Sequence, residues 1–276
     1  MHDFGRDVDL KMDRPEEKIA DVMPEEKDRQ RILLTLSYDG TAYAGWQRQE
    51  NAMSVQQCVE EALQKLTGER TAITGAGRTD AGVHALDQRA HFDTISRIPP
   101  EKYSFALNSC LPMDIRVLAS KAVDHRFHAR FDAQGKLYTY RIHNATHASA
   151  LYRCFRAHVP MPLDMEAMER SLFPLVGTHD FAAFQAAGST VKTTVRTISQ
   201  LDLAHRGDEI TLTIQGNGFL YNMVRIIAGT MIEIGQHRLA ESAFAHALET
   251  KNRRDLGMTA PACGLELSRV FYGEGE

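Results

Sequence analysis

The chain has 276 residues, of which 43% are hydrophobic and 25% charged, the balance of a soluble globular protein that buries one large core or two smaller ones. No window approaches the roughly 18 uncharged apolar residues of a membrane span, and the N-terminus lacks a secretory signal pattern, so we expect a cytoplasmic protein. Its four cysteines form no C-x-x-C pair, which argues against a disulfide framework and a zinc knuckle.

The formal net charge of −4 is concentrated at the N-terminus. Residues 1–30 hold ten acids and six bases, together with Pro15 and Pro24, and show no apolar period. Such a segment cannot bury enough apolar surface to fold alone. We therefore expect residues 1–30 to be a disordered or loosely attached acidic tail, with ordered structure beginning near Arg31.

The first half of the chain gives an alternating series of strands and helices. RILLTLSY (31–38) is a short apolar run that ends at turn residues, which is typical of a strand. Ser54 and Gln57 have the spacing of a capping box and Gly68 is a stop signal, so a helix is expected between Ser54 and Gly68. Strands at 71–76 and 88–94, a helix at 101–109 and a strand at 114–123 follow. The order is β-α-β-β-α-β, the ferredoxin-like unit.

The second half repeats this order. The expected elements are a strand at 136–143, a helix at 164–173, strands at 195–204 and 209–215, helices at 222–235 and 241–250, and a strand at 265–272. We therefore predict an α+β protein of two ferredoxin-like (βαββαβ, RRM-like) halves, 31–131 and 132–276, with antiparallel sheets side by side and a functional cleft between them.

The basic residues gather in one segment. Residues 126–156 carry six bases against Asp132 alone, with six aromatic residues interleaved. This composition suits a polyanion with stackable bases, and it equally suits a solvated charged face. The bases are Arg126, Arg130, Lys136, Arg141, Arg153 and Arg156.

GAGRTDAGVHA (75–85) sets Arg78 and Asp80 among glycines. Glycines let a ligand approach the backbone closely, so Asp80 is a candidate catalytic carboxylate, although an arbitrary Asp among glycines is more often a turn or cap residue. The motif does not match a dinucleotide-binding fingerprint, and no phosphate-binding P-loop occurs in the chain.

Two further motifs carry aromatic and basic residues. YDGTAYAGWQRQ (38–49) holds Arg48 and the only tryptophan, Trp46. These two residues suit contacts with nucleic acid, and Trp46 equally suits a place in the protein core. GNGFLYNMVR (216–225) sets Arg225 in the first turn of a helix, where an arginine is unfavourable beside the helix dipole. This position suits an arginine with an anionic partner, and it equally suits one that faces solvent.

Two pairs of histidines have spacings that would suit a metal, His125 with His128 and His143 with His147. No nearby cysteine or carboxylate cluster completes a site, so we interpret them as polar loop or strand-end residues and expect no metal.

Taken together, the segments resemble the tRNA pseudouridine synthase A family. The resemblance rests on the three motifs above and on LNSCLPMDIRV, FHARFDAQGKLYTY, GTHDFAAF and APACGLEL, which follow the family's order from about residue 31 to 272. It implies an isomerase that converts uridine to pseudouridine at positions thirty-eight to forty of the tRNA anticodon stem-loop. It further implies a homodimer with tRNA bridging both subunits, a basic cleft, and no cofactor or metal.

The resemblance also implies roles for individual residues. Asp80 corresponds to the catalytic aspartate, the nucleophile of the reaction. Three roles stay open for its carboxylate: attack on the ribose C1′, attack on the base, and removal of a C2′ proton. Arg225 corresponds to its ionic partner, Tyr138 to the tyrosine that packs on the target base, Arg78 to the arginine that holds the flipped-out nucleotide, and Leu265 to the apolar wall under the uracil. Further RNA contacts are expected at Arg48, Arg126, Arg130 and Arg141.

One stretch departs from the family pattern. After GVHA this chain has Asp87-Gln88-Arg89-Ala90 where the family has a Gly-Gln-Val-Ala type of stretch. Two other classes of function are weighed beside the isomerase: a non-catalytic RNA-binding module, and a hydrolase that uses Asp80 as its nucleophile. The hydrolase would require a second acid or base on the same loop, or a metal cluster, and the sequence shows neither.

Overall fold

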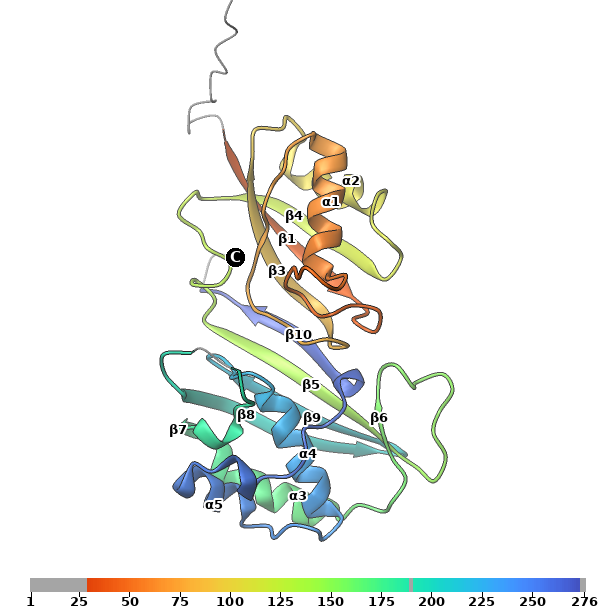
Figure 1. The fold of residues 1–276 in the computed structure, drawn as a ribbon, viewed down its shortest axis with the longest axis vertical. Helices are drawn as coiled ribbons and strands as arrows, with labels where there is room; N and C mark the ends of the chain where they lie inside the picture. Colours follow the sequence, from red (N-terminus) through yellow and green to blue (C-terminus); the bar gives the residue numbers. More distant parts are fainter. Residues whose placement is uncertain (1–28, 189–190, 274–276) are drawn as a thin grey trace, which may run out of the picture.

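The computed structural model describes residues 29–188 and 191–273, so the tail predicted for residues 1–30 lies almost entirely outside the described residues. The described strands form one sheet in the order β4-β1-β3-β10-β5-β9-β8-β7, with β2 beside β3 and β6 beside β5 (Figure 1). The protein is therefore an α+β protein with a large mixed sheet. None of its described helices is long and apolar enough to cross a membrane.

The elements of the first half largely match their predictions. They are β1 (Gln30–Tyr38), α1 (Val55–Thr67), β2 (Thr74–Gly75), β3 (His84–Thr94), α2 (Tyr103–Asn108) and β4 (Ile115–Val123). Ser54 accepts a hydrogen bond from the Gln57 backbone N–H and Gly68 adopts a left-handed φ of 76°, as the cap signals predicted. The strand expected at 71–76 is shorter, because the Ile73 N–H donates to the Glu60 side chain instead of to a strand.

The elements of the second half follow the predicted order with two additions. They are β5 (Gly135–Asn144), β6 (Ala157–Val159), α3 (Met165–Leu172), β7 (Gly177–Asp180), β8 (Val195–Arg206), β9 (Glu209–Gly216), α4 (Met223–Gly235), α5 (Ala243–Thr250) and β10 (Leu265–Phe271). Sequence reasoning missed β6 and β7, which are too short to show alternation.

The sheets of the two halves, predicted to lie side by side, are joined into one. The last strand, β10, pairs antiparallel with β5 and parallel with β3, which joins the strands of both halves into one sheet. The parallel contact is short, since only Glu266 opposite His84 and Leu267 opposite Ala85 are in register. We call the β3–β10 contact the junction.

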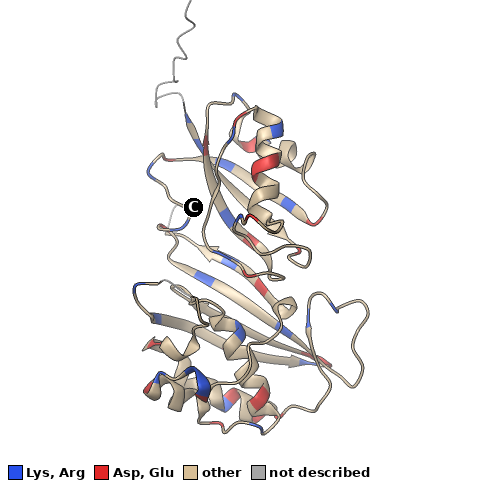
Figure 2. Cartoon of the chain, in the orientation of Figure 1, with Lys and Arg blue, Asp and Glu red and all other residues tan. Residues whose placement is uncertain are grey.

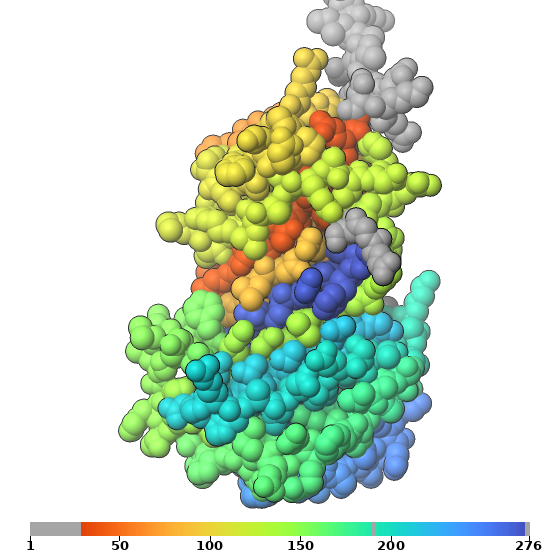
Figure 3. Space-filling view, turned by 180° about the vertical axis from the view of Figure 1, so that it is seen from behind, coloured from red at the N-terminus to blue at the C-terminus, as the bar shows by residue number. Residues whose placement is uncertain are grey.

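Helices cover one face of this sheet. In Figure 1, α1 and α2 lie over the strands of the first half, and α3, α4 and α5 lie over those of the second half. Figure 3 shows the opposite face, where strands from β1 to β8 run side by side without a covering helix. Successive residues of β9 alternate between half-buried and buried. The buried residues face the helices, and the half-buried residues face away from them.

The departure from the family pattern has a structural role at the junction. The Asp87 carboxylate accepts a hydrogen bond from the Val270 backbone N–H on β10 at 3.1 Å, and its other oxygen accepts from Arg89 at 2.5 Å. Asp87 therefore ties β3 to β10 beyond the last in-register pair. The Arg89 backbone carbonyl accepts a hydrogen bond from the Ala76 N–H at 2.7 Å, at the start of the loop that carries Asp80.

The segment before β10 packs closely on α4 at Gly229. A Cβ at Gly229 would overlap the Met258 carbonyl, whereas a Cβ at Gly235 would meet the flexible Met168 sulfur at 2.6 Å. We expect Gly229→Ala to lower the free energy of unfolding by about 1–3 kcal/mol, because a backbone carbonyl cannot move aside as a side chain can. Chemical denaturation measures this, with Gly235→Ala as the control; an equal loss in both variants would contradict the packing described.

Candidate active site

The loop between β2 and β3 carries Asp80 and is held on both sides of it, at Thr79 and at Gly82. The Tyr38 hydroxyl lies 2.7 Å from the Thr79 hydroxyl, and the Trp46 backbone N–H donates to the Thr79 carbonyl at 3.0 Å. On the other side, the Gly82 N–H donates to the Tyr43 carbonyl at 3.2 Å. The backbone on both sides of Asp80 is thus fixed, while its side chain stays free to face the second half.

The YDGTAYAGW motif is the support of this loop. Trp46 is only 3% exposed and its ring stacks on Tyr38 with centroids 6.1 Å apart, so the core alternative for Trp46 is confirmed. Gly45 has a left-handed φ of 92°, and a Cβ there would overlap the Thr79 carbonyl. Only glycine therefore allows the two loops to pack this closely.

Arg225 comes from the other half and is held by three groups. Its Nε donates to the Ala260 carbonyl at 2.8 Å, and its Nη1 donates to the Asn222 side-chain oxygen at 2.8 Å. The same Nη1 lies 3.6 Å from an Asp80 carboxylate oxygen. At this distance the two side chains attract each other as charges, although the separation exceeds that of a direct hydrogen bond.

The Asp80–Arg225 pair is largely withdrawn from water. The Asp80 side chain is 24% exposed and that of Arg225 17%. Burial raises the pKa of Asp80 above its ordinary value, and the nearby Arg225 charge opposes this by lowering the pKa. Arg225 therefore favours the ionised carboxylate in surroundings that would otherwise favour the neutral acid.

Tyr138 and Leu265 lie on neighbouring strands beneath this pair. Tyr138 of β5 is 7% exposed, and Phe219 packs edge-on against its ring with centroids 5.2 Å apart. Burial raises the pKa of Tyr138, and the Tyr38 and Asp80 groups raise it further, so its phenol is neutral at pH 7. Leu265 is 5% exposed and stands opposite Tyr140 on β5, two residue pairs from Tyr138. The structure thus brings together the loop, α4, β5 and β10.

Arg78 is an exposed residue of the loop. It lies two residues before Asp80, and among residues 29–188 and 191–273 no hydrogen bond or ion pair of its guanidinium is described. An exposed, unpaired arginine beside a half-buried carboxylate is available to an anionic or flat ligand.

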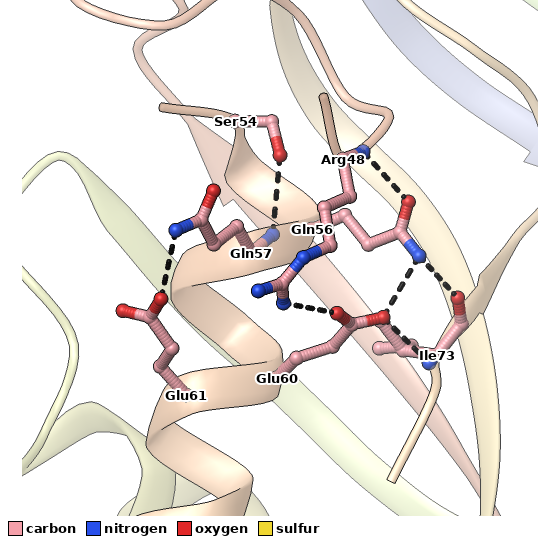
Figure 4. Close-up of polar contacts among 7 residues, drawn as sticks. All are labelled: Arg48, Ser54, Gln56, Gln57, Glu60, Glu61 and Ile73. Carbon is pink, nitrogen blue, oxygen red and sulfur yellow. Dashed lines mark hydrogen bonds and ion pairs between the residues drawn. The ribbon is translucent and has the colours of Figure 1, made fainter. Parts of the chain in front are cut away.

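Arg48 is placed elsewhere, on the outer side of α1 (Figure 4). Its guanidinium lies 3.0 Å from Glu60, and its backbone N–H donates to the Gln56 side chain. Glu60 in turn accepts from the Ile73 N–H, so Arg48 completes a network that fixes β2 against α1. Its RNA contact stays a prediction.

The other predicted RNA contacts differ in their surroundings. Arg126 is almost fully exposed and pairs with Asp124. Arg141 pairs with Glu266 at 2.9 Å on the face of β5 opposite Tyr138, since successive residues of a strand point to opposite faces. Arg130 is exposed beside the Phe131 ring, 5.8 Å from its centroid. Figure 2 shows basic segments along the strands in the middle of the sheet. The three contacts stay predictions.

The comparisons with known proteins decide the family. A family model described as tRNA pseudouridine synthase matches residues 35–132 and 173–273. Proteins named tRNA pseudouridine synthase A are similar over most of both chains: that of Acetivibrio thermocellus is 47% identical over 87% of this chain and 99% of its own, and that of Brevibacillus brevis 45% identical over 88% and 99%. The chain belongs to the tRNA pseudouridine synthase family.

Among solved structures the likeness is distant. An H/ACA ribonucleoprotein bound to a substrate RNA containing 2′-deoxyuridine is similar with a TM-score of 0.38 and 10% identity, over 86% of this chain and 47% of that one. A Cbf5–Nop10–Gar1 complex is similar with a TM-score of 0.38 and 12% identity, over 86% and 48%. This chain spans about half the length of both.

Sequence reasoning on this synthase missed the residues that hold Arg225. Asn222 begins α4 with a left-handed φ of 62°, a conformation that asparagine tolerates better than most residues, and this directs its side chain to Arg225. Ala260 accepts from the Arg225 side chain and donates its N–H to the Arg225 carbonyl. Both lie in motifs that were noted, but only the fold brings them together.

Metal sites and surface hollows are the other features that bear on function. In the part of the chain that the structure describes, no group of three or more His, Cys, Asp or Glu could hold a metal ion. The two surface hollows described lie beside Arg48 and Gln57 and beside Glu69 and Asp93, and neither is lined by Asp80. The predicted basic cleft therefore stays a proposal.

The effect of Arg225 on Asp80 is measurable. We expect Arg225→Gln to raise the pKa of the Asp80 carboxyl, because burial then acts without the opposing charge, and the acid limb of the activity should move to higher pH. NMR titration of isotope-labelled aspartate measures the pKa, with Asp80→Asn to assign the signal. Arg89→Gln, which removes an arginine from Asp87 instead, should leave Asp80 unchanged. A pKa that is unchanged or lower in Arg225→Gln would contradict this account.

Proposed function

We propose that this member of the tRNA pseudouridine synthase family isomerises uridine to pseudouridine at positions thirty-eight to forty of the tRNA anticodon stem-loop, with Asp80 as its catalytic carboxylate. One observation carries the proposal: Asp80, on a loop bearing the family's motif, lies 3.6 Å from an arginine of the other half in partly dry surroundings. The names and the close similarity of the relatives support the substrate and the reaction.

The reaction is an internal rearrangement. The bond from ribose C1′ to uracil N1 breaks, a bond from C1′ to C5 forms, the C5 proton leaves to solvent, and N1 gains a proton. Because atoms and electrons balance within the nucleoside, the reaction needs no oxidant, reductant or transferred group. Attack of Asp80 on C1′, attack on the base, and removal of a C2′ proton all require an ionised carboxylate, and the Arg225 charge favours that state.

The neighbouring residues would divide the other tasks. Tyr138, buried and neutral, would pack on the target uracil, and Leu265 would supply the apolar wall below it. A base inside a helix is out of reach of a carboxylate, so the target nucleotide must leave its stack first. Exposed Arg78 would then hold the displaced nucleotide, and the exposed Arg130 would contact RNA nearby.

We also propose that each half is a ferredoxin-like unit, 31–131 and 132–276, with a basic cleft between the halves. The strand orders β4-β1-β3-β2 and β10-β5-β9-β8 support this, because both follow the order 4-1-3-2 of that unit. The family resemblance further supports a cytoplasmic homodimer that binds one tRNA across both subunits and works without a cofactor.

Asp80→Asn tests the role of the carboxylate. We expect it to reduce the release of tritium from tRNA labelled at uracil C5 at least about a thousandfold, because the amide lacks the nucleophilic or basic oxygen. Binding of an anticodon stem-loop RNA should change little. Equal tritium release from wild type and Asp80→Asn would contradict the assignment of Asp80 and favour a non-catalytic RNA-binding role for this loop.

The fate of the base separates the isomerase from a hydrolase. We expect the wild-type protein to produce pseudouridine within the intact RNA and no free uracil, because the detached base is rejoined through C5. Chromatography of the reaction mixture and of nuclease-digested RNA measures both products. Free uracil in proportion to enzyme turnover would show hydrolysis of the glycosidic bond instead.

A further inference from the structure

Lys136 is a cation next to the loop that carries Asp80. Its Nζ lies 2.9 Å from the position that a Cβ on Gly77 would occupy, and Gly77 is three residues before Asp80. Lys136 shares a face of β5 with Tyr138, because residues two apart in a strand point the same way. The ammonium group therefore lies on the face of the sheet that holds the proposed active site.

The surroundings of Lys136 are unusually bare. The strand partners of Lys136 are Gly216 on β9 and Val270 on β10, and Gly77 lies against the end of the Lys136 side chain. A Cβ at Gly77 would crowd the flexible end of the Lys136 side chain, which would have to shift. The glycines of the GAGRTD motif thus leave space for the ammonium group as well as for the ligand.

Lys136 belongs to a group of like charges. Arg130 and Arg196 are close enough to lower the pKa of Lys136, and a Cβ on Gly218 would lie 3.6 Å from the Arg196 Nε. We call Arg130, Lys136 and Arg196 the basic triad. Within residues 29–188 and 191–273 no carboxylate is described that pairs with any of the three.

Several half-buried cations elsewhere in the chain have a carboxylate partner. Arg31 pairs with Asp93 at 2.7 Å, and Arg141 pairs with Glu266 at 2.9 Å. A half-buried cation beside like charges is unfavourable unless an anion compensates it. The charges of the basic triad therefore suit an anionic ligand.

The burial and the neighbouring charges destabilise the charged form of Lys136. Burial, followed by the charges of Arg130 and then Arg196, lowers the pKa of Lys136 to about 8. The three residues next to Lys136, which are Gly216 on β9, Val270 on β10 and Gly77 in the loop, have no titratable side chain. Arg130 and Arg196 are therefore the charged groups that lower the pKa of Lys136. A bound phosphate would raise this pKa again by supplying the missing opposite charge.

We propose that the basic triad, centred on Lys136, binds a backbone phosphate of the RNA beside the target nucleotide. The inference rests on the proposed function, because RNA is the polyanion that would bring a phosphate within reach of the Asp80 loop. The exposed Phe131 ring stacks on His128 with centroids 4.2 Å apart and adjoins Arg130, which gives an adjacent unpaired base a surface on which to stack. Lys136 is then a substrate-binding residue that positions the nucleotide.

Binding of a fluorescein-labelled anticodon stem-loop RNA tests the proposal. We expect Lys136→Met to weaken binding about tenfold at low salt and to reduce the slope of log affinity against log salt by about one, the signature of one lost phosphate contact. Lys136→Arg should retain most of the affinity, because it retains the charge. Lys121→Met, on the exposed edge of β4, is the control and should bind as the wild type does.

Two further measurements separate binding from a structural role. Wild-type affinity should fall between about pH 7 and pH 9, as the Lys136 pKa of about 8 requires, and Lys136→Arg should lose this dependence. Lys136→Met should melt no lower than wild type, because it removes an uncompensated charge. Wild-type affinity and salt slope in Lys136→Met would overturn the proposal, as would equal losses of affinity and melting temperature in both variants.

Failure of the proposed function would look different. The binding assay needs no catalysis, so Asp80→Asn should show the wild-type affinity and the same effect of Lys136→Met. If wild type makes no pseudouridine yet the Lys136 effect persists, the phosphate site stands and the proposed reaction falls. If pseudouridine forms normally while Lys136→Met binds as wild type does, the phosphate site falls and the reaction stands.

Discussion

The structure depends on one electrostatic contact between its halves, the Asp80–Arg225 pair. Each partner is useful only when the other half is correctly placed, since Asp80 belongs to a loop of the first half and Arg225 to a helix of the second. The junction supplies that placement: β10 pairs with β3 and β5, and Asp87 of β3 binds the backbone of β10. Backbone pairing that begins directly after the loop, at His84 of β3, therefore sets the distance across which the two charges act.

Charges near the loop include a half-buried cation without a described carboxylate partner. Most half-buried cations in the described residues have a close carboxylate, as Arg31 and Arg141 do. Around the Asp80 loop, Arg225 is shared between a carboxylate, a carbonyl and an amide, and Lys136 has no anionic partner described. Uncompensated charge lowers stability, and proteins often accept that loss where a ligand binds.

Local signals predicted most of the elements, because caps and periodicity act within one segment. Ser54 and Gly68 bounded α1, and the alternation of Ile210, Leu212 and Ile214 identified β9. The junction could not be predicted in this way, since its two in-register pairs depend on how the finished halves meet. The very short β2 was overestimated, because a side chain from α1 takes the hydrogen bond that a longer strand would use.

The candidate site was predicted through family motifs more than through spacing. Asp80 and Arg225 are far apart in the sequence, and no local pattern relates them. Asn222 and Ala260 were missed because their contacts with Arg225 exist only after α4 packs on the segment before β10. Lys136 was counted as one of several bases, since composition does not reveal that its ammonium group is half-buried.

The most direct test of the central claim is a nucleotide-resolution map of pseudouridine in tRNA from a strain that lacks this gene and carries either wild type or Asp80→Asn. This account predicts that wild type restores pseudouridine at positions thirty-eight to forty of the tRNA and that Asp80→Asn, expressed at the same level, restores none. Restoration by Asp80→Asn, or restoration by wild type only at other positions, would contradict it.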